Sequence, residues 1–357
     1  MSELSSGVVH DPSAEHASAP SVPDERLGTL LGLASQTQTA LAPSERRLAL
    51  DTLSILLPQA SAAMREQLMQ RLRVMEKPPR ALLLTALHML PGADVAALVE
   101  EARLPDDLLV EICEAGAPAL LEAVVARRRL SAVVCTALAQ HAPPDALARM
   151  LRNEGAEITE PVWWKLLERA MNATAVQQAL AERTDLPVPI ACELFWHVSS
   201  ALRRRLILQQ PGTSAQMEKL LQLAHAPGTE SAQAFLEHLQ IALATLLEGD
   251  RNGAARRLAS FLDVHPSTIR RISRDATGEA FAIMVKSARL RTHEFGKLLT
   301  ELAAGRLARL WPFLADPDGL RDFYAAMSVS RARATLLYWD WRSRNIGPYA
   351  HLPPVQA

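Results

Sequence analysis

Apolar residues between Pro78 and Gln209 recur with a period of 26 to 28 residues. The successive units start at Leu104, Leu130, Ile158 and Leu186, and further apolar residues follow each start at about four, eight and twenty positions. Apolar residues four apart mark one face of a helix, so each unit contains two short helices. A hairpin of two short helices cannot bury its apolar face alone, so neighbouring units must stack.

The interior positions of these units share aliphatic side chains. Offset four holds Leu108, Val134, Val162 and Ile190, and offset eight holds Ile112, Leu138, Leu166 and Leu194. Leu138 and Leu166 occupy equivalent places, so both are expected to be buried where successive units meet. The same spacing places further unit starts at 212, 238, 264 and 290. These starts bring with them Leu243, Leu246, Leu247, Leu258, Ala259, Ile269, Ile272, Met284, Val285, Phe295, Leu298, Leu299, Leu310 and Trp311.

The pattern divides the chain into six segments. They are a disordered N-terminal tail (1–24), an N-terminal helical cap (25–76), a helical repeat array (77–209), an irregular or hinge-like unit (210–230), C-terminal repeats with a cap (231–345), and a C-terminal tail (346–357). Helices outside the repeat are expected at 25–41, 44–57, 61–75 and 330–344. The fold class that follows is an all-α solenoid of short hairpins with atypical ends.

The composition agrees with a helical chain and bears on where the protein is located and what it binds. Ala and Leu dominate, Gly is scarce, and the net charge is only −1, whereas a nucleic-acid-binding protein usually carries basic excess. Residues 1–23 lack the basic and apolar blocks of a signal peptide, and no apolar run reaches the length of a membrane span. These features predict a cytoplasmic protein that does not insert into membranes. Cys113, Cys135 and Cys192 form no CxxC pair, so we interpret them as free buried thiols rather than metal ligands.

Three short runs resemble a helical family known from alphaproteobacteria. They are Ala126–Ser131 (ARRRLS), the link from Leu151 through Gly155 and Ala156 to Thr159, and Arg183–Pro187 (RTDLP). That family is a domain of unknown function whose members resemble HEAT-type repeat proteins, and the similarity covers roughly residues 45–315. The resemblance implies HEAT-like hairpins, and it implies no catalytic residues.

Two aromatic pairs lie in adjacent units. Trp163 and Phe195 take interior offsets and are expected in the core, whereas Trp164 and Trp196 lie about one helical turn apart in offset. If these two side chains are exposed together, they form a hot spot for a protein partner. The alternative is that they seal the junction between units.

Arginine clusters occur in two places, at Arg127, Arg128 and Arg129 and at Arg203, Arg204 and Arg205. Guanidinium groups in such clusters bind phosphate or an acidic partner. The structural alternative is a solvated turn in which the arginine stems cover apolar surface.

Residues 255–274 resemble a helix-turn-helix, with Asp263 at the turn and Ile269 and Ile272 anchoring the second helix. Contacts to DNA would then come from Ser267, Thr268, Arg270, Arg271 and Arg274. Every apolar position of this motif is also required by the repeat, so two stacked hairpins explain the same pattern.

The sequence favours a non-enzymatic scaffold or regulatory adaptor that binds another protein or a peptide, because solenoids expose long surfaces. It contains no HExxH, Gly-rich phosphate loop or GxSxG, so we assign no catalytic, cofactor or metal residues. The alternative function is nucleic-acid binding, through residues 255–274 or through an arginine-lined concave face.

Overall fold

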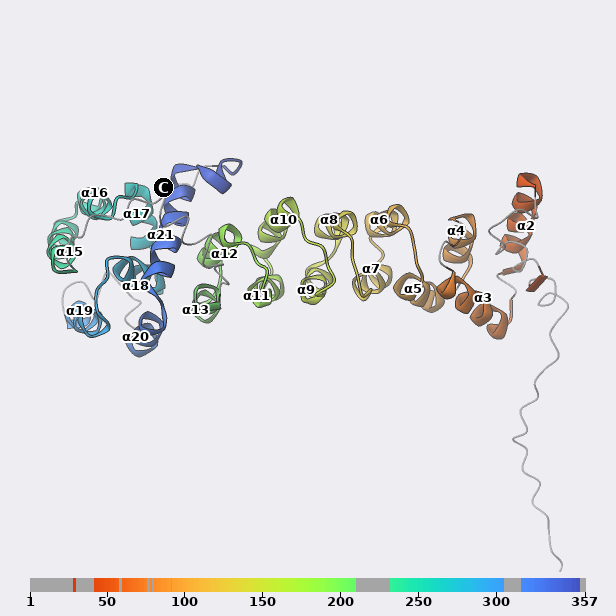
Figure 1. The fold of residues 1–357 in the computed structure, drawn as a ribbon, viewed down its shortest axis with the longest axis horizontal. Coiled ribbons are helices and arrows are strands. Elements are labelled where there is room, and N and C mark those ends of the chain that lie inside the picture. The colour runs from red at the N-terminus through yellow and green to blue at the C-terminus, as the bar shows by residue number, and fades with distance from the viewer. Residues whose placement is uncertain are drawn as a thin grey trace, which may run out of the picture. The chain divides into compact units, whose positions relative to one another are not determined.

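The computed structural model describes residues 28–29, 42–57, 60–75, 78, 80–90, 92–209, 232–304 and 316–353 (Figure 1). Within these ranges the backbone forms α-helices and short 3-10 helices, with one isolated bridge between Leu130 and Ala156. The described chain is therefore all-α, as predicted. It divides into two compact units, residues 1–128 and 129–357. The predictions for 1–24, most of 25–41, 210–230, Leu310 and Trp311 lie outside the described residues.

Unit 1 contains six described helices whose ends match local sequence signals. They are α2 (Pro43–Leu56), α3 (Ala62–Val74), α4 (Arg80–Met89), α5 (Gly92–Glu101), α6 (Asp106–Ala115) and α7 (Pro118–Val125). The Ser61 hydroxyl accepts from the Met64 amide and caps α3, and Gly116 ends α6 with φ at 71°. Helices two apart in the chain pack together: α2 on α4, α3 on α5 and α5 on α7. The helices predicted at 44–57 and 61–75 are confirmed.

The first part of unit 2 shows the same alternation. Its elements are α8 (Ala132–His141), α9 (Pro144–Arg152), α10 (Glu160–Ala170), α11 (Thr174–Glu182), α12 (Val188–Leu194), the 3-10 helix η2 (Phe195–His197) and α13 (Ser200–Gln209). The helices α8, α10 and α12 form one row, and α9, α11 and α13 form the other. Each hairpin therefore contributes one helix to each row, and neighbouring hairpins stack.

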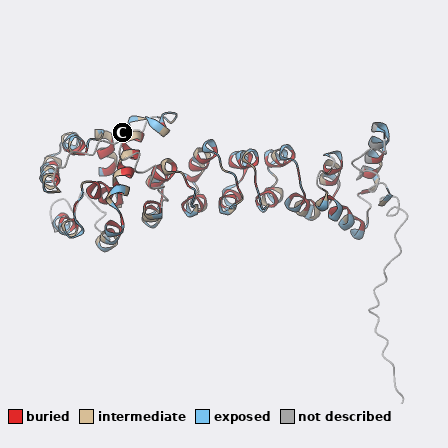
Figure 2. Cartoon of the chain, in the orientation of Figure 1, coloured by how far each residue is buried: buried red, intermediate tan, exposed pale blue. Residues whose placement is uncertain are grey.

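The predicted repeat positions correspond to this stack. A first helix begins two residues after each start at Leu104, Leu130, Ile158 and Leu186. All eight residues at offsets four and eight are buried, and Figure 2 shows that buried residues line the helix faces turned toward neighbouring helices within each unit. The burial expected at Leu138 and Leu166 is thus confirmed.

The C-terminal part of unit 2 follows the spacing only in part. Its elements are α15 (Ala232–Leu247), α16 (Arg251–Leu262), α17 (Pro266–Ser273), α18 (Glu279–Ser287), α19 (Thr292–Ala304), α20 (Pro317–Ala326), α21 (Val329–Arg344) and η5 (Gly347–Tyr349). The helices α17 and α19 begin two residues after the predicted starts 264 and 290. The start at 238 is wrong, because the first helix of that hairpin, α15, already begins at Ala232. The hairpin itself is present, since α15 packs on α16 and Leu258 and Ala259 are buried. Leu247, placed in the core by that start, is 47% exposed.

Helix α18 is the centre of this C-terminal part. Every residue from Glu279 to Ser287 is buried, and α17, α20 and α21 all pack against the helix. Helix α21 also reaches back to α12, where the Trp339 indole N–H donates to the Cys192 carbonyl at 3.2 Å. Packing here joins segments far apart in the sequence, so it goes beyond stacking of neighbours.

Candidate interaction surface

The two tryptophans considered as surface residues, Trp164 and Trp196, lie in different environments. Their neighbour Trp163 is buried, as expected, with the Arg183 guanidinium 5.6 Å from its ring centre. Trp164, the next residue on α10, is half-buried. Its ring meets the rings of Tyr349 and His351 edge-on, at centroid distances of 5.9 and 4.9 Å. Trp164 therefore lies at the edge of the core, beside the end of the chain.

Trp196 belongs to an internal aromatic cluster. Its ring lies 4.7 Å from that of Trp339 and 5.3 Å from that of the buried Phe195, and the Arg271 guanidinium lies 4.4 Å from its centre. Its indole nitrogen is buried and has no hydrogen-bond partner among the residues that the structure describes. The structure does not pair Trp196 with Trp164; each of them packs on residues from the C-terminal end of the chain. Trp196 therefore seals the contact between η2, α17 and α21.

The first arginine cluster is split between two roles. The Arg127 guanidinium donates to the carbonyls of Val99 and Ala102, at the end of α5. The last carbonyls of a helix lack partners within the helix, and a cation there also complements the helix dipole. Burial lowers the pKa of Arg127. Arg128 ends unit 1 and Arg129 opens unit 2, and both side chains are exposed.

The same use of arginine recurs between the hairpins of unit 2. Arg169 on α10 donates to the Gln140 and Ala142 carbonyls at the end of α8. Arg183, after α11, donates at 2.9 Å to the Asn153 carbonyl that follows α9. In each case a side chain of one hairpin satisfies carbonyls of the preceding one. These arginines stabilise the stack.

Arg203, in the second cluster, is a buried structural residue. Its guanidinium donates to the Asp275 carboxylate, to the Thr277 hydroxyl at 2.7 Å and to the Val198 carbonyl at 3.0 Å. The Arg203 guanidinium therefore stabilises the fold. The interpretation that Arg203 binds phosphate or an acidic partner is wrong, because its hydrogen-bond donors already have intramolecular partners. The cause is tertiary: the sequence shows three adjacent arginines but not the carboxylate 72 residues away.

Asp275 is a site that the sequence prediction missed. Its carboxylate accepts from the amides of Gly278 and Ala280 at 3.1 and 3.4 Å, as well as from Arg203. It thus satisfies free amides at the start of α18. A local signal existed, because Asp275 comes shortly before the Gly278–Glu279 helix start, but acidic residues near helix starts are too common to single it out.

Arg204 links three elements. It donates to Glu279 on α18 at 2.9 Å and to Asp316, the residue before α20, at 3.0 Å. A hydrogen bond from the Gly319 amide, followed by that from Arg204, lowers the pKa of Asp316. Like Arg203, this residue has intramolecular partners, so the structure gives neither a docking role. Arg205 bonds to Gln209 on its own helix.

The segment that resembles a helix-turn-helix forms two helices, α16 and α17, that pack together, and Asp263 between them adopts the left-handed conformation with φ at 52°. Its second helix is, however, packed in place. The buried Thr268 hydroxyl donates to Asp340 at 3.1 Å, and Arg271 makes two hydrogen bonds to Glu193, at 3.1 and 3.2 Å.

The other candidate DNA contacts are less constrained. The Ser267 hydroxyl lies 2.6 Å from the His265 ring nitrogen, Arg270 is half-buried, and Arg274 is exposed. The helix-turn-helix alternative would require Thr268 and Arg271 to contact DNA, but their polar groups already bond to the buried carboxylates of Asp340 and Glu193.

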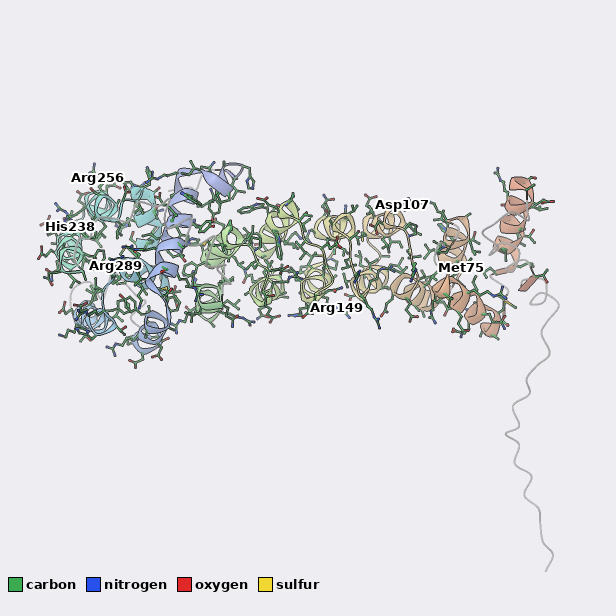
Figure 3. All side chains as sticks on the ribbon, viewed as in Figure 1. Met75, Asp107, Arg149, His238, Arg256 and Arg289 are labelled. Atoms are coloured by element: carbon green, nitrogen blue, oxygen red, sulfur yellow. The ribbon has the colours of Figure 1, made fainter. Side chains whose placement is uncertain are left out.

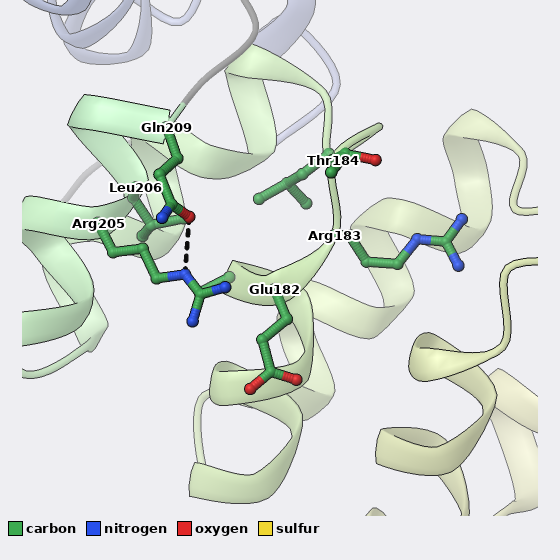
Figure 4. Close-up of a pocket in the computed structure, with 8 residues that line it drawn as sticks. Glu182, Arg183, Thr184, Arg205, Leu206 and Gln209 are labelled. Carbon is green, nitrogen blue, oxygen red and sulfur yellow. Dashed lines mark hydrogen bonds between the residues drawn. The ribbon is translucent and has the colours of Figure 1, made fainter.

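A small cavity lies between the end of α11 and α13 (Figure 4). Its volume is about 40 Å³, room for water rather than for an organic substrate. Glu182, Thr184, Arg205, Leu206 and Gln209 are among its lining residues, whereas the Arg183 side chain points away toward α9. The Arg205 Nε donates to the Gln209 side chain at 2.8 Å across one edge.

The three cysteines are free and buried, as expected. Burial raises the pKa of Cys135 to about 11, so its thiol stays protonated at neutral pH. Within the described ranges, His, Cys, Asp and Glu form no group of three placed to hold a metal ion. No described helix combines the length and the apolar character of a membrane span.

The described residues form stacked pairs of α-helices, and arginine side chains hydrogen-bond to the carbonyls of the preceding pair. In the C-terminal part, α17, α20 and α21 pack around the buried helix α18. The family model described as "Uncharacterised protein conserved in bacteria (DUF2336)" matches residues 95–336. The chain belongs to this bacterial family, a domain of unknown function. No curated protein and no solved structure matches it.

Proposed function

We propose that this protein is a non-enzymatic interaction scaffold or regulatory adaptor of the cytoplasm, whose partner is another protein or a peptide. The observation that carries the proposal is Trp164, a half-buried indole on the middle helix of the row α8, α10 and α12. Tryptophan at the rim of a packed surface is the residue type most enriched in binding hot spots. The HEAT-like character of the hairpins belongs to the same proposal.

The internal arginines support a peptide partner rather than a polyanion. Arg127, Arg169, Arg183 and Arg203 donate to carbonyls within their own unit. The charge they carry is therefore used to hold the hairpins together. A stacked array of this kind offers an extended, mixed surface for a protein chain.

Replacing Trp164 by Ala is expected to reduce partner capture by about tenfold or more, because a hot-spot tryptophan contributes at least about 2 kcal/mol to binding. The variant should lose capture of host proteins after nuclease treatment, and its melting temperature should change little. Met171→Ala, at the end of the same helix and partly exposed, is the matched control and should capture normally. A large fall in melting temperature in Trp164→Ala would mark the residue as structural and contradict the proposal.

Nucleic-acid binding is the second candidate, favoured by arginines outside the internal network. Arg256, Arg257, Arg274 and Arg289 are exposed, and none makes an ion pair within the described ranges (Figure 3 labels Arg256 and Arg289). Such side chains reach phosphates without reading bases. The candidate is therefore backbone binding without sequence preference.

Binding to duplex DNA is expected to be weak, indifferent to sequence and steeply lost with salt, because it would rest on arginine–phosphate contacts alone. Titrations with random and genomic fragments at two salt concentrations test this. Arg256→Ala combined with Arg257→Ala should weaken binding to both fragments alike. Sequence-selective binding that persists at about 150 mM salt and disappears in Arg271→Ala would contradict this expectation and favour a transcription factor.

A further inference from the structure

The chain turns sharply after α21 and runs back toward α10 and α12 (Figure 1). Asn345 ends α21 with φ at 57°, and Gly347 follows with φ at 61°. A Cβ at Gly347 would lie 3.4 Å from a carbon of the Trp341 ring, which is ordinary van der Waals contact, so the turn favours glycine for its backbone conformation. The sequence predicted only a tail at 346–357, whereas residues 346–353 form an ordered segment, which we call the C-terminal strap.

Tyr349 anchors the strap. Its side chain is fully buried, and its hydroxyl donates to the Pro189 carbonyl on α12 at 3.1 Å. Burial raises the pKa of this phenol well above its ordinary range, so the hydroxyl remains a donor at any physiological pH. One aromatic side chain with one directed hydrogen bond is the pattern by which short peptides are recognised in preformed pockets.

The remaining strap contacts lie around this anchor. The rings of Tyr349 and His351 meet Trp164 edge-on. Two hydrogen bonds of 2.9 Å close the far end, from the side-chain Nδ2 of Asn345 to the Leu352 carbonyl and from the Arg342 guanidinium to the Pro353 carbonyl. The strap thus covers Trp164, and both of its ends are held at the end of α21, one by the chain itself and the other by these two hydrogen bonds.

The strap contacts the surface without ion pairs. From Asn345 to the end of the chain the sequence contains no Asp, Glu, Lys or Arg. Trp164, which the strap contacts, is a partly buried apolar residue packed on the core. Recognition is therefore apolar and hydrogen-bonded.

We propose that the surface formed by Trp164 and Pro189, here called the Trp164 face, is a docking site for a short peptide containing Pro-Tyr, and that the chain's own strap occupies it. A partner segment of the same chemistry binds by displacing the strap. This inference rests on the proposed function, because it names the partner class and the regulation of the surface assigned there. The strap is an intramolecular competitor.

The first experiment uses a labelled synthetic peptide of residues 345–357 and the full-length protein. Tyr349→Ala removes the anchor of the tethered strap, so this variant should bind the added peptide about tenfold or more tightly than the wild type, since competition lowers apparent affinity. The double variant Tyr349→Ala with Trp164→Ala should lose binding. A matched peptide that itself carries Tyr349→Ala should bind neither protein. Equal binding to wild type and to folded Tyr349→Ala, or binding to neither, overturns the proposal.

A second measurement needs no variant. The strap amides of Tyr349, Ala350 and Leu352 are hydrogen-bonded within the strap, at 3.3, 3.2 and 3.0 Å. If the strap opens on its own, these amides should exchange with solvent about 100-fold faster than those in the middle of α21. Exchange at the rate of α21 would make the strap a fixed part of the fold and overturn the proposal, whether or not Tyr349→Ala folds.

The two proposals fail in different ways. Peptide binding that depends on Tyr349 and Trp164, with host-protein capture unchanged in Trp164→Ala, would uphold the docking site and remove the proposed scaffold role of this surface. If Trp164→Ala loses capture of host proteins and the peptide of residues 345–357 does not bind, the proposed scaffold role is upheld. The proposal that the strap competes for this surface is then contradicted.

Discussion

Asp275→Ala is expected to lower the free energy of unfolding by about 3–5 kcal/mol, because removing one partner of a buried ion pair leaves the other charge uncompensated. Arg203 would remain buried beside an apolar methyl group, with carbonyls and one hydroxyl as its remaining partners. The amides of Gly278 and Ala280 would lose their acceptor at the same time. Both losses fall at the start of α18, on which α17, α20 and α21 pack.

Thermal and urea unfolding followed by circular dichroism measure the effect. Asp318→Ala is the matched control, because this carboxylate also pairs with an arginine, Arg321 at 3.0 Å, but is largely exposed; an exposed pair contributes at most about 1 kcal/mol. Asp275→Asn keeps an acceptor for the amides and should lie between the two. A loss in Asp275→Ala as small as in the control would show that Arg203 finds other compensation.

Leu138→Ala and Leu166→Ala are each expected to destabilise unit 2 by about 2–5 kcal/mol, through lost apolar burial and the cavity left behind. Both side chains are fully buried on the row α8–α10, at the junction between successive hairpins. Unfolding of the two variants should therefore begin at lower temperature or denaturant concentration than in the wild type.

Val133→Ala provides the comparison, because Val133 precedes Val134 on α8 but faces solvent with 59% of its surface exposed. Its effect should stay within about 0.5 kcal/mol. Equal effects at Val133 and Leu138 would contradict the assignment of the helix face. Small effects at both leucines would mean that the hairpins tolerate a cavity at their junction.

The sequence predicted the stack well because that part of the fold is local. Apolar spacing reports which face of a helix is buried, and hairpins that pack on their neighbours need little more information. The error at 238 has the same origin: the expected hairpin is present as α15 and α16, but its first helix has 16 residues and already begins at Ala232. Apolar spacing reports which face of a helix is buried, and it does not report where a long helix begins.

The candidate site was predicted less well because its contacts are long-range. Trp164 and Trp196 were singled out by residue type, yet their environments depend on Tyr349, His351 and Trp339 near the other end of unit 2. Likewise, three adjacent arginines look alike in the sequence, while Arg203 is buried and Arg205 bonds along its own helix. The sequence identifies the chemical type of each side chain, but it does not identify the distant residues that each side chain contacts in the fold.

The position of α18 has a consequence for how the protein is made. The hairpins α8 to α13 contact their neighbours, so their packing can form as each one leaves the ribosome. The helix α18 must wait, because its cover is α21, which is synthesised more than 40 residues later and which itself bonds back to Cys192. Contacts of such high sequence separation form slowly. During synthesis the face of α18 that packs on α21 is therefore exposed until α21 emerges. A chain that stops before α21 is expected to aggregate rather than to form a shorter working protein.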